Sequence, residues 1–476
     1  MATNGRRDVP TFIGTCVDSG GMSSLEADRE QWSTRAGFVL AAVGSAVGLG
    51  NIWRFPFVTG EGGGAGFVLV YLLFVVSIGL PAILIEFVVG RRTRSNPVGA
   101  FERIGTGVWR YVGWIFVVTT FVIMSYYSVV AGWTIRYTLL GAGEGYAADP
   151  GVAGEQFLTL AQGVEAMAFH ALFLSVIVVI VGLGIRRGIE LAVKVMVPAI
   201  LLIVVGLAVW AATLDGAGAA YAYYLSPDVG AIAADWTSIL PAAAGQAFYT
   251  LSLGFGIMIT YASYLGEDRN LIEDAAIIIG FDTAIALAVG LVVFPILFTA
   301  GIDPGDPGVG AIFITLAAAF GELPAGGLVG AVFFLTVAVA ALSSAISLTE
   351  VVVAYAIDER GMGRLRATAL VCTALFVLGL GPAYDIVLLE LYDGLADGVL
   401  LLLGGLLVTA YVAWGWSEEA TGELEGGIGR LGRLGTAWIW LARGPVLVVI
   451  GVSLALGIAE YVEFIRGSFL PWLRGS

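Results

Sequence analysis

Two short polar stretches lie inside long apolar segments, and their residue types are suited to binding ions and charged ligands. They are residues 44–56 (GSAVGLGNIWRFP) and residues 246–256 (QAFYTLSLGFG). Glycine and proline interrupt helices, and an interrupted helix leaves backbone carbonyl and N–H groups without partners. Free carbonyls can bind Na⁺, and the N–H groups that begin a helix can bind a carboxylate. Either stretch alone could be a glycine kink made for packing, but the two together favour a site for a zwitterion and sodium.

Other kinds of chemistry find little support in the sequence. His170 is the only histidine, so a nucleophile–histidine–acid set has no base to use, and packing is the simplest role for this residue at the start of an apolar segment. The sequence has no metal-ligand cluster and no phosphate-binding loop. Cys16 and Cys372 are far apart, so we expect no disulfide. The net charge of −14 disfavours nucleic acid as a partner. We therefore expect neither an enzyme nor a nucleic-acid-binding protein.

The elements that position the two stretches must be membrane-spanning helices. Of the 476 residues, 58% are hydrophobic and only 13% are charged. Runs of roughly 20 apolar residues cross a bilayer as helices, whereas a β-barrel would need an alternating pattern. The predicted fold class is an all-α integral membrane protein of about eleven transmembrane helices surrounded by membrane lipid. The expected spans are residues 36–56, 66–90, 108–140, 168–185, 190–212, 238–264, 271–301, 326–357, 367–381, 384–415 and 444–466, with a short helical hairpin outside the membrane near 309–321.

The two polar stretches fall in the first and sixth of these spans, which run in opposite directions. Broken helices at matching places of two halves with opposite topology are typical of an inverted five-plus-five repeat with its binding site at the midplane. We expect a cytoplasmic tail at 1–35, a first repeat at 36–215, a second repeat at 236–416, and a cytoplasmic loop with the eleventh helix at 417–476.

The basic residues predict the orientation of the chain. With the N-terminus inside, all of the 23 lysines and arginines lie in the tail or the cytoplasmic loops except Arg54, Arg136, Arg466 and Arg474. The positive-inside rule therefore places the N-terminus in the cytoplasm and the C-terminus outside, in a multi-pass protein of the cell (plasma) membrane.

The chain resembles the neurotransmitter:sodium symporter family, and within it the prokaryotic branch that includes the bacterial leucine transporter. The resemblance runs from about residue 31 to the last span. Its motifs are GSAVGLGNIWRFP at 44–56, GGGAGF at 62–67, SYYSVVAGW at 125–133, GQAFYTLSLGFGIMITYASYL at 245–265 and AALSSAISLTEVVVAY at 340–355.

The resemblance implies two sodium sites. The first would use the carbonyl of Ala46 with the side chains of Asn51, Thr250 and Asp282, and the substrate carboxylate would be a further ligand. Oxygen ligands suit a hard cation. The second site would combine three carbonyls with two hydroxyls, from Gly44, Val47, Ala340, Ser343 and Ser344. From the residues alone, the two serines could instead bond to their own helix.

The resemblance also implies an amino acid pocket formed by spans one, three, six and eight. Its residues would be Ser45, Ala46, Leu49, Gly50, Tyr127, Tyr249, Thr250, Ser252, Phe255, Ser344 and Leu348. Tyr127 would donate to the substrate carboxylate. The family often has Asn at the position of Ser45 and Phe at that of Tyr249. Because the walls are mostly apolar and carry no acid for a cationic side chain, a neutral, hydrophobic amino acid fits best.

Charged residues beside the pocket resemble the gates of the family. The outer gate would pair Arg54 with Asp393, with snorkelling of Arg54 to the headgroups as the alternative. The inner gate would pair Arg29 with Asp358, beside Tyr264. Such pairs must break once per cycle, which suits accessible salt bridges worth roughly 0–1 kcal/mol.

Two buried carboxylates complete the prediction. Asp282 stands where chloride-dependent relatives carry Asn, and Ala286 removes a hydroxyl that chloride would use, so we expect no chloride requirement. Glu86, in the second span, is interpreted as a structural partner of the backbone of span six. The predicted function is sodium-coupled amino acid symport by alternating access, with two sodium ions. A membrane sensor that binds an amino acid without moving it is the alternative, and a channel would need a continuous polar pore. The sequence leaves open the amino acid, the sodium stoichiometry, proton antiport and the oligomeric state.

Overall fold

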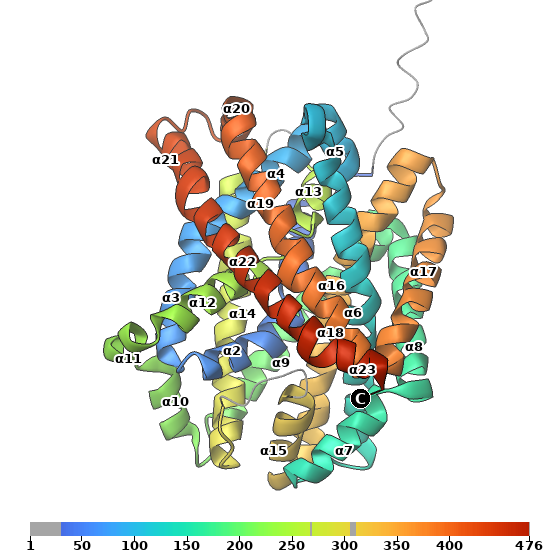
Figure 1. Ribbon diagram of the computed structural model, residues 1–476, viewed down its shortest axis with the longest axis vertical. Coiled ribbons are helices and arrows are strands. Elements are labelled where there is room, and N and C mark those ends of the chain that lie inside the picture. Colours follow the sequence, from blue (N-terminus) through green and yellow to red (C-terminus); the bar gives the residue numbers. More distant parts are fainter. Residues whose placement is uncertain (1–29, 267–268, 305–310, 476) are drawn as a thin grey trace, which may run out of the picture.

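The computed structural model describes residues 30–266, 269–304 and 311–475, and these residues form helices with no strand among them. Figure 1 shows long helices packed as one bundle, with shorter helices at both of its ends. The α-helices are α1 (Arg35–Ala46), α2 (Phe55–Glu61), α3 (Ala65–Phe74), α4 (Leu80–Thr93), α5 (Pro97–Ile104), α6 (Val112–Gly143), α7 (Pro150–Ala161), α8 (Gly163–Gly182), α9 (Glu190–Ala211), α10 (Ala217–Leu225), α11 (Val229–Ala234), α12 (Trp236–Thr250), α13 (Ile257–Ala262), α14 (Leu271–Thr299), α15 (Ala317–Glu322), α16 (Gly326–Arg360), α17 (Arg364–Tyr384), α18 (Ile386–Leu395), α19 (Leu402–Ala410), α20 (Ser417–Glu425), α21 (Arg433–Leu441), α22 (Leu447–Phe464) and α23 (Leu470–Arg474).

Nine helical stretches of the described chain are long and apolar enough to cross a membrane. They are Ala65–Thr93, Gly107–Gly143, Gly163–Gly182, Ile185–Ala211, Leu271–Thr299, Gly326–Arg360, Arg364–Tyr384, Ile386–Gly415 and Arg433–Arg474. Several join two α-helices through a π-helical turn. The bent pair Arg35–Ala46 and Gly50–Glu61 raises the number to ten. The all-α membrane fold is thus confirmed, but the count of eleven is not, because the sixth predicted span is divided between two shorter helices.

The first predicted break lies in the segment 44–56. Helix α1 ends at Ala46, and Val47 leaves the helical conformation with φ −76° and ψ 89°. A π-helical turn, Gly50–Arg54, then leads into α2, and the two halves are bent by 46°. Pro56 stands at the start of α2, where its missing N–H costs no helical hydrogen bond. The glycines and the proline therefore act as the sequence predicts, by ending one half-helix and beginning another.

The second break separates α12 from α13. Ser252, Gly254 and Gly256 all have positive φ, at 53°, 80° and 72°. A Cβ atom on Gly254 would lie 2.4 Å from the backbone oxygen of Leu401, so only glycine fits at this position. The carboxylate of Glu86, which is 1% exposed, accepts a hydrogen bond of 2.7 Å from the Gly254 N–H. The predicted role of Glu86 as a partner of the broken backbone is confirmed.

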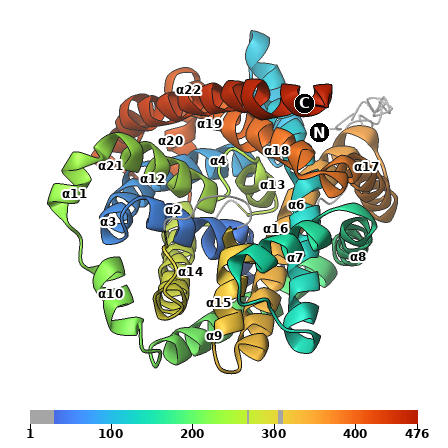
Figure 2. The same ribbon diagram turned by 60° about the horizontal axis from the view of Figure 1, so that its bottom comes forward.

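The two breaks lie next to each other inside the bundle. Gln246 in α12 donates from Nε2 to the carbonyl of Gly50 over 3.0 Å, and Ser252 Oγ donates to the carbonyl of Ser45 over 3.0 Å. The exterior is formed by helices such as α22, which runs along one side of the bundle in Figure 2. The segment Arg433–Arg474 that contains α22 is only 11% buried over its most apolar part. The predicted hairpin near 309–321 is helical over 311–322, and its first residues lie outside the described part.

Candidate functional site

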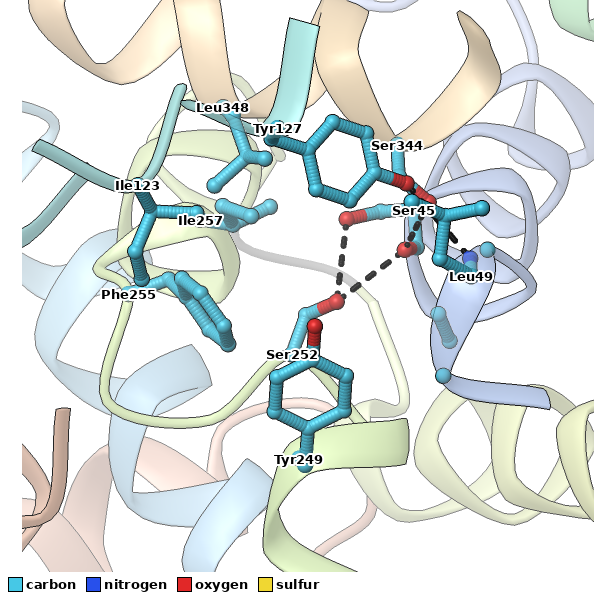
Figure 3. Close-up of a pocket in the computed structure, with 13 residues that line it drawn as sticks. Ser45, Leu49, Ile123, Tyr127, Tyr249, Ser252, Phe255, Ile257, Ser344 and Leu348 are labelled. Carbon is cyan, nitrogen blue, oxygen red and sulfur yellow. Dashed lines mark hydrogen bonds between the residues drawn. The ribbon is translucent and has the colours of Figure 1, made fainter. Parts of the chain in front are cut away.

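A small cavity lies between the two breaks. Figure 3 shows its lining, which comes from the first break, the second break, α6 and α16. The lining residues are Ser45, Ala46, Gly48, Leu49, Gly50, Ile123, Tyr127, Tyr249, Ser252, Phe255, Ile257, Ser344 and Leu348. Every predicted pocket residue is among them except Thr250, which faces a neighbouring polar cluster. Gly48, Ile123 and Ile257 were missed, because an isolated apolar or glycine residue gives no sequence signal for facing a pocket.

One side of the cavity offers hydrogen-bond donors. The N–H of Leu49 donates to the hydroxyl oxygen of Tyr127 over 3.5 Å, and the Tyr127 hydroxyl still has its own proton to donate. Leu49 directly precedes the second half-helix of the first break, where N–H groups carry partial positive charge. A Cβ added at Gly48 would lie 2.2 Å from Ser344 Oγ, so glycine at this position allows Ser344 to approach the break closely. This side is suited to a carboxylate.

The opposite end of the cavity is apolar. Ile123, Phe255, Ile257 and Leu348 gather there in Figure 3, and the Tyr249 and Phe255 rings meet edge to face with centroids 6.1 Å apart. None of the described lining side chains carries a charge. An uncharged, apolar group is therefore the best complement to this end.

The polar cluster that contains Thr250 is the first predicted sodium site. Asn51, Thr250 and Asp282 are each fully buried. Asn51 Nδ2 donates to Asp282 Oδ1 over 2.7 Å, and Thr250 Oγ1 lies 3.0 Å from Asp282 Oδ2. Ala46, the fourth predicted ligand, is the last residue of α1. The hydroxyl of Thr250 and the carboxylate of Asp282 thus bring oxygens together beside the Asn51 amide, whose Oδ1 accepts from the Gly48 N–H, and oxygen ligands suit a hard cation such as Na⁺.

The second predicted sodium site is equally compact. Ser343 Oγ is 3.4 Å from the carbonyl oxygen of Val47 and 2.8 Å from that of Ala340. Ser344 Oγ is 3.5 Å from the Gly44 carbonyl and donates to that of Ser45 over 2.8 Å. The structure therefore places all five predicted groups within one network between α1 and α16. Ser344 donates to a carbonyl of α1, so the alternative in which both serines bond only to their own helix does not hold for it.

The region around Asp282 contains polar groups without partners. Within the described chain, the buried Tyr71 hydroxyl, Gln246 Oε1 and Thr283 Oγ1 have no hydrogen-bond partner. Ala286 lies on the same helix as Asp282 and is fully buried.

The predicted outer gate requires a correction. Arg54 forms its ion pair with Asp397, with Nη1 and Oδ2 2.9 Å apart, and not with Asp393. The two aspartates are four residues apart on adjoining helical turns, so they face the same side and the sequence could not choose between them. The Arg54 guanidinium also lies 4.8 Å from the centroid of the Tyr249 ring, which connects the ion pair to the cavity wall.

Of the predicted inner gate, Arg29 lies outside the described residues. Asp358 accepts hydrogen bonds from the backbone N–H and Nδ2 of Asn96, at 3.1 Å and 3.2 Å. Asn96 in turn caps α5 by accepting from Val98 and Gly99. Tyr264 donates from its hydroxyl to Glu350 Oε1 over 2.8 Å.

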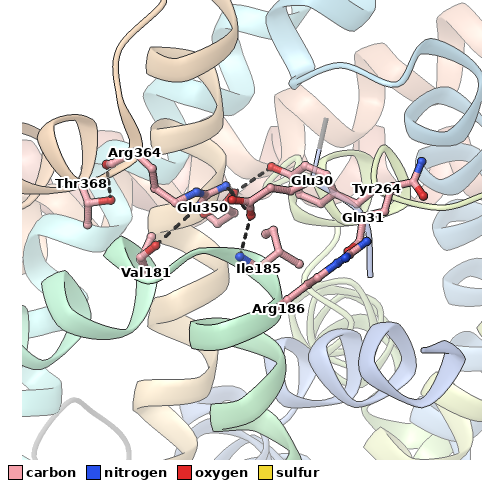
Figure 4. A network of polar contacts seen from close by, with 9 residues as sticks. All are labelled: Glu30, Gln31, Val181, Ile185, Arg186, Tyr264, Glu350, Arg364 and Thr368. Carbon is pink, nitrogen blue, oxygen red and sulfur yellow. Dashed lines mark hydrogen bonds and ion pairs between the residues drawn. The ribbon is translucent and has the colours of Figure 1, made fainter. Parts of the chain in front are cut away.

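Glu350 belongs to a polar network that the sequence analysis missed (Figure 4). It is fully buried in α16 and receives two hydrogen bonds from Arg364, at 2.8 Å and 3.1 Å. Arg364 is also 3.3 Å from Glu30, and Glu30 Oε2 accepts from the N–H of Ile185 over 2.7 Å. The network thus links the segment before α1 to the π-helical turn Ile185–Ile189, to α16 and to α17. An acid in a long apolar helix was the available signal, because such residues need a partner.

Comparisons with known proteins agree with this geometry. The model of the sodium:neurotransmitter symporter family matches residues 29–143 and 155–471. The sodium-dependent transporter YhdH of Bacillus subtilis is 33% identical over 450 residues, which cover 90% of this chain and 98% of the relative. A sodium-dependent transporter of Methanocaldococcus jannaschii is 33% identical over 459 residues, covering 91% of each chain. The crystal structure of MhsT in complex with L-phenylalanine superposes with a TM-score of 0.80 at 37% identity, covering 90% of this chain and 99% of MhsT.

Proposed function

Because the chain belongs to the sodium:neurotransmitter symporter family, we propose that it carries a neutral, hydrophobic amino acid across the membrane together with sodium. Membership makes it a multi-pass membrane protein of a sodium-dependent transporter family, and not an enzyme. The amino acid class, the ion count and the chloride independence described below are proposals for this chain.

The observation that carries the proposal is the uncharged cavity between the two broken helices. It combines a donor side at Leu49 and Tyr127 with an apolar end at Ile123, Phe255 and Leu348. A carboxylate would bind on the donor side, and an apolar side chain would fill the far end. The substrate ammonium would face Ser252 and the C-terminal end of α12, where backbone carbonyls carry partial negative charge. The L-phenylalanine complex of the similar protein MhsT supports an amino acid as the ligand.

Two sodium ions would bind beside the cavity. The Asn51–Thr250–Asp282 cluster would hold one ion next to the substrate carboxylate, with the Ala46 carbonyl. The other would bind among Gly44, Val47, Ala340, Ser343 and Ser344. Each sodium charge that crosses a potential of about 100 mV contributes roughly 2.3 kcal/mol, so two ions could support uphill uptake.

Chloride would not be required, because Asp282 already supplies a fixed negative charge beside the first ion. Its carboxylate is bound by Asn51 and Thr250, which holds it in place. A protein with a neutral residue at this position would need a mobile anion to offset the sodium charge.

Alternating access would open one side of the cavity at a time. The pair Arg54–Asp397 would close the outer side, and the network around Glu350, with Arg29 and Asp358, would close the inner side. This assignment uses the predicted orientation in the plasma membrane, with the N-terminus in the cytoplasm, and the two repeats at 36–215 and 236–416. Two closable sides favour a transporter over an amino acid sensor, which needs only one.

Uptake into proteoliposomes tests the proposal. Radiolabelled leucine, alanine, tryptophan, tyrosine and phenylalanine would be offered under an inward Na⁺ gradient, with K⁺ replacing Na⁺ and gluconate replacing chloride in parallel. We expect concentrative uptake of a hydrophobic amino acid that needs Na⁺ and survives chloride removal. Sodium-dependent binding without accumulation would favour the sensor. If the protein neither binds nor takes up any of these amino acids, the proposed substrate class is wrong.

A matched variant ties the uptake to the cavity. Tyr127→Phe removes only the hydroxyl that faces the carboxylate position, and a hydrogen bond to a charged group is worth about 1.5–3 kcal/mol. We expect the half-saturation concentration of the amino acid to rise by about tenfold or more. Tyr137→Phe, on the same helix, removes a buried hydroxyl that has no hydrogen-bond partner in the described chain, and it should leave uptake unchanged.

A further inference from the structure

We infer that Ser347, which does not line the cavity, is a positioning residue that orients the Ser45 hydroxyl so that the pocket presents two hydroxyl lone pairs to a primary ammonium. The inference rests on the proposed amino acid substrate and deepens it. It assigns a role to Ser45, where the family often has Asn, and to a serine on α16 that the sequence analysis left without a function.

The geometry joins three hydroxyls from three helical segments. Ser45 is the next-to-last residue of α1, Ser252 lies in the second break and Ser347 lies in α16, and all three are buried. The Ser45 and Ser347 hydroxyl oxygens are 2.7 Å apart, and those of Ser45 and Ser252 are 3.4 Å apart. Figure 3 shows the Ser45 and Ser252 hydroxyls at the cavity wall.

Counting protons gives each hydroxyl a direction. A serine hydroxyl has one proton and two lone pairs. Ser252 Oγ uses its proton on the Ser45 carbonyl at 3.0 Å. Ser347 Oγ lies 2.7 Å from the carbonyl of Ser344 in its own helix, which is a good acceptor for the Ser347 proton. The Ser347 oxygen can then accept the Ser45 proton at 2.7 Å, the shortest contact that Ser45 Oγ makes with another hydroxyl.

This direction of donation changes what the cavity offers. Both protons of the wall, on Ser45 and Ser252, point away from the cavity, and only lone pairs face inward. An ammonium has three N–H donors and no acceptor, so it matches a wall of acceptors. Without Ser347, the Ser45 proton has Ser252 Oγ as its remaining partner at 3.4 Å, and it would turn toward the place of the ammonium.

The pair of acceptors also predicts a substrate preference. A primary ammonium can donate to Ser45 and Ser252 and still keep one N–H for a carbonyl of the broken helices. A secondary ammonium, as in an N-methyl amino acid, has one donor fewer and a methyl group in its place. Primary amino acids should therefore bind more tightly than their N-methyl derivatives, and this preference should depend on Ser347.

The experiment measures equilibrium binding of the radiolabelled amino acid that wild type binds best, in saturating Na⁺, for Ser347→Ala, Ser45→Ala and the double variant. We expect Ser347→Ala to weaken binding by roughly fivefold to tenfold, the size of one hydrogen bond. In the Ser45→Ala background, Ser347→Ala should weaken binding by less than twofold, because residue 45 then has no hydroxyl proton that could turn toward the ammonium. The preference for the primary amine over its N-methyl derivative should narrow in Ser347→Ala.

Controls separate this role from a structural one. Ser347→Thr keeps a hydroxyl and should bind within about twofold of wild type. Thr349→Ala removes another buried hydroxyl of α16, one without a hydrogen-bond partner in the described chain, and should bind as wild type does. The Na⁺ concentration for half-maximal binding should be unchanged in Ser347→Ala.

Two results would overturn the inference: Ser347→Ala binding as tightly as wild type, or an equal loss with and without the Ser45 hydroxyl. If Ser347→Ala does not fold, Ser347→Cys, which nearly keeps the volume but is a weak acceptor, takes its place in the same cycle. Failure of wild type to bind any amino acid would instead refute the proposed function.

Discussion

Arg54 and Asp397 form an ion pair across 2.9 Å on one side of the cavity, and the guanidinium of Arg54 also contacts the ring of Tyr249. The side chain of Arg54 is 35% exposed and that of Asp397 is 20% exposed, so water reaches both partners. A pair of this kind is weak enough to open and close, as the proposed outer gate requires. Asp393, one turn earlier, faces the same region without forming an ion pair in the described chain.

The Arg54–Asp397 ion pair predicts that substitutions of Asp397 and Asp393 affect transport unequally. Asp397→Asn should lower the initial rate of sodium-driven uptake by about fivefold, since losing an accessible pair costs about 1 kcal/mol. Asp393→Asn should keep more than half of the wild-type rate. Uptake into proteoliposomes, normalised to the amount of reconstituted protein, measures both. A larger loss in Asp393→Asn would show that the closed gate uses the other carboxylate.

The cluster around Asp282 predicts the effect of removing sodium. A ligand that binds the folded state stabilises it by an amount that grows with its concentration. Replacing Na⁺ by K⁺ should therefore lower the midpoint of thermal unfolding of the wild-type protein. In Asp282→Asn the difference should shrink, and the Na⁺ concentration for half-maximal stabilisation should rise at least about tenfold, which is roughly 1.4 kcal/mol.

Glu419→Gln is the matched control for Asp282→Asn, because it removes a carboxylate that is exposed on α20. Its response to Na⁺ should equal that of wild type. If Na⁺ stabilises Asp282→Asn as much as it stabilises wild type, this carboxylate is not a sodium ligand.

The sequence predicted the two helix breaks and the contact of Glu86 with the second break because each depended on local chemistry. Gly254 requires a conformation that other residues avoid, and Glu86 is an acid in an apolar helix that must find a partner. The proposed Na⁺ ligands and pocket residues came from motifs that resemble a known family, and the structure places those residues near one another. What the residues alone indicated was two interrupted helices and a polar midplane.

The errors came from contacts that depend on three-dimensional packing. Asp393 and Asp397 share a helix face, so only the position of Arg54 in space decides which one is paired. Glu350 and Arg364 are joined across the turn between α16 and α17, where the path of the chain, not the spacing, brings them together. The count of eleven spans was not reproduced, since the second break leaves helices of 15 and 6 residues.

The Glu350–Arg364 pair predicts a strong effect of a single change and a weak effect of a double one. Glu350→Gln leaves Arg364, 15% exposed, without its buried carboxylate, and breaking a buried pair costs about 3–5 kcal/mol. We expect a large drop in the unfolding midpoint and loss of uptake. Glu350→Gln with Arg364→Gln removes both charges and should recover much of the stability.

Thermal unfolding in detergent gives the coupling between the two positions. Arg360→Gln is the control, since Arg360 is an exposed arginine of the same region that contacts only the Tyr355 hydroxyl in the described chain. Additive losses in the double variant would mean that the two side chains act independently.

The contacts of Arg91 predict that the segment around α20, between the last two long helices, is held to the bundle by an ion pair. Its side chain is 1% exposed, and its charge is balanced by Glu423 of α20, with Nε and Oε1 2.6 Å apart. It also donates to the carbonyl of Arg269, just before α14. Glu423→Ala would leave a buried guanidinium without its carboxylate, so we expect a loss of about 3 kcal/mol or more of stability, seen as a lower unfolding midpoint. Glu419→Ala, on the exposed side of the same helix, should change the midpoint by less than a fifth as much.

Proteolysis separates local from global effects. If α20 is held chiefly by this pair, the Glu423→Ala variant should be cut between α20 and α21 at temperatures where the rest of the protein is intact. Equal stability of the two variants would mean that apolar contacts of α20, at Ala420 and Leu424, hold the segment without the ion pair.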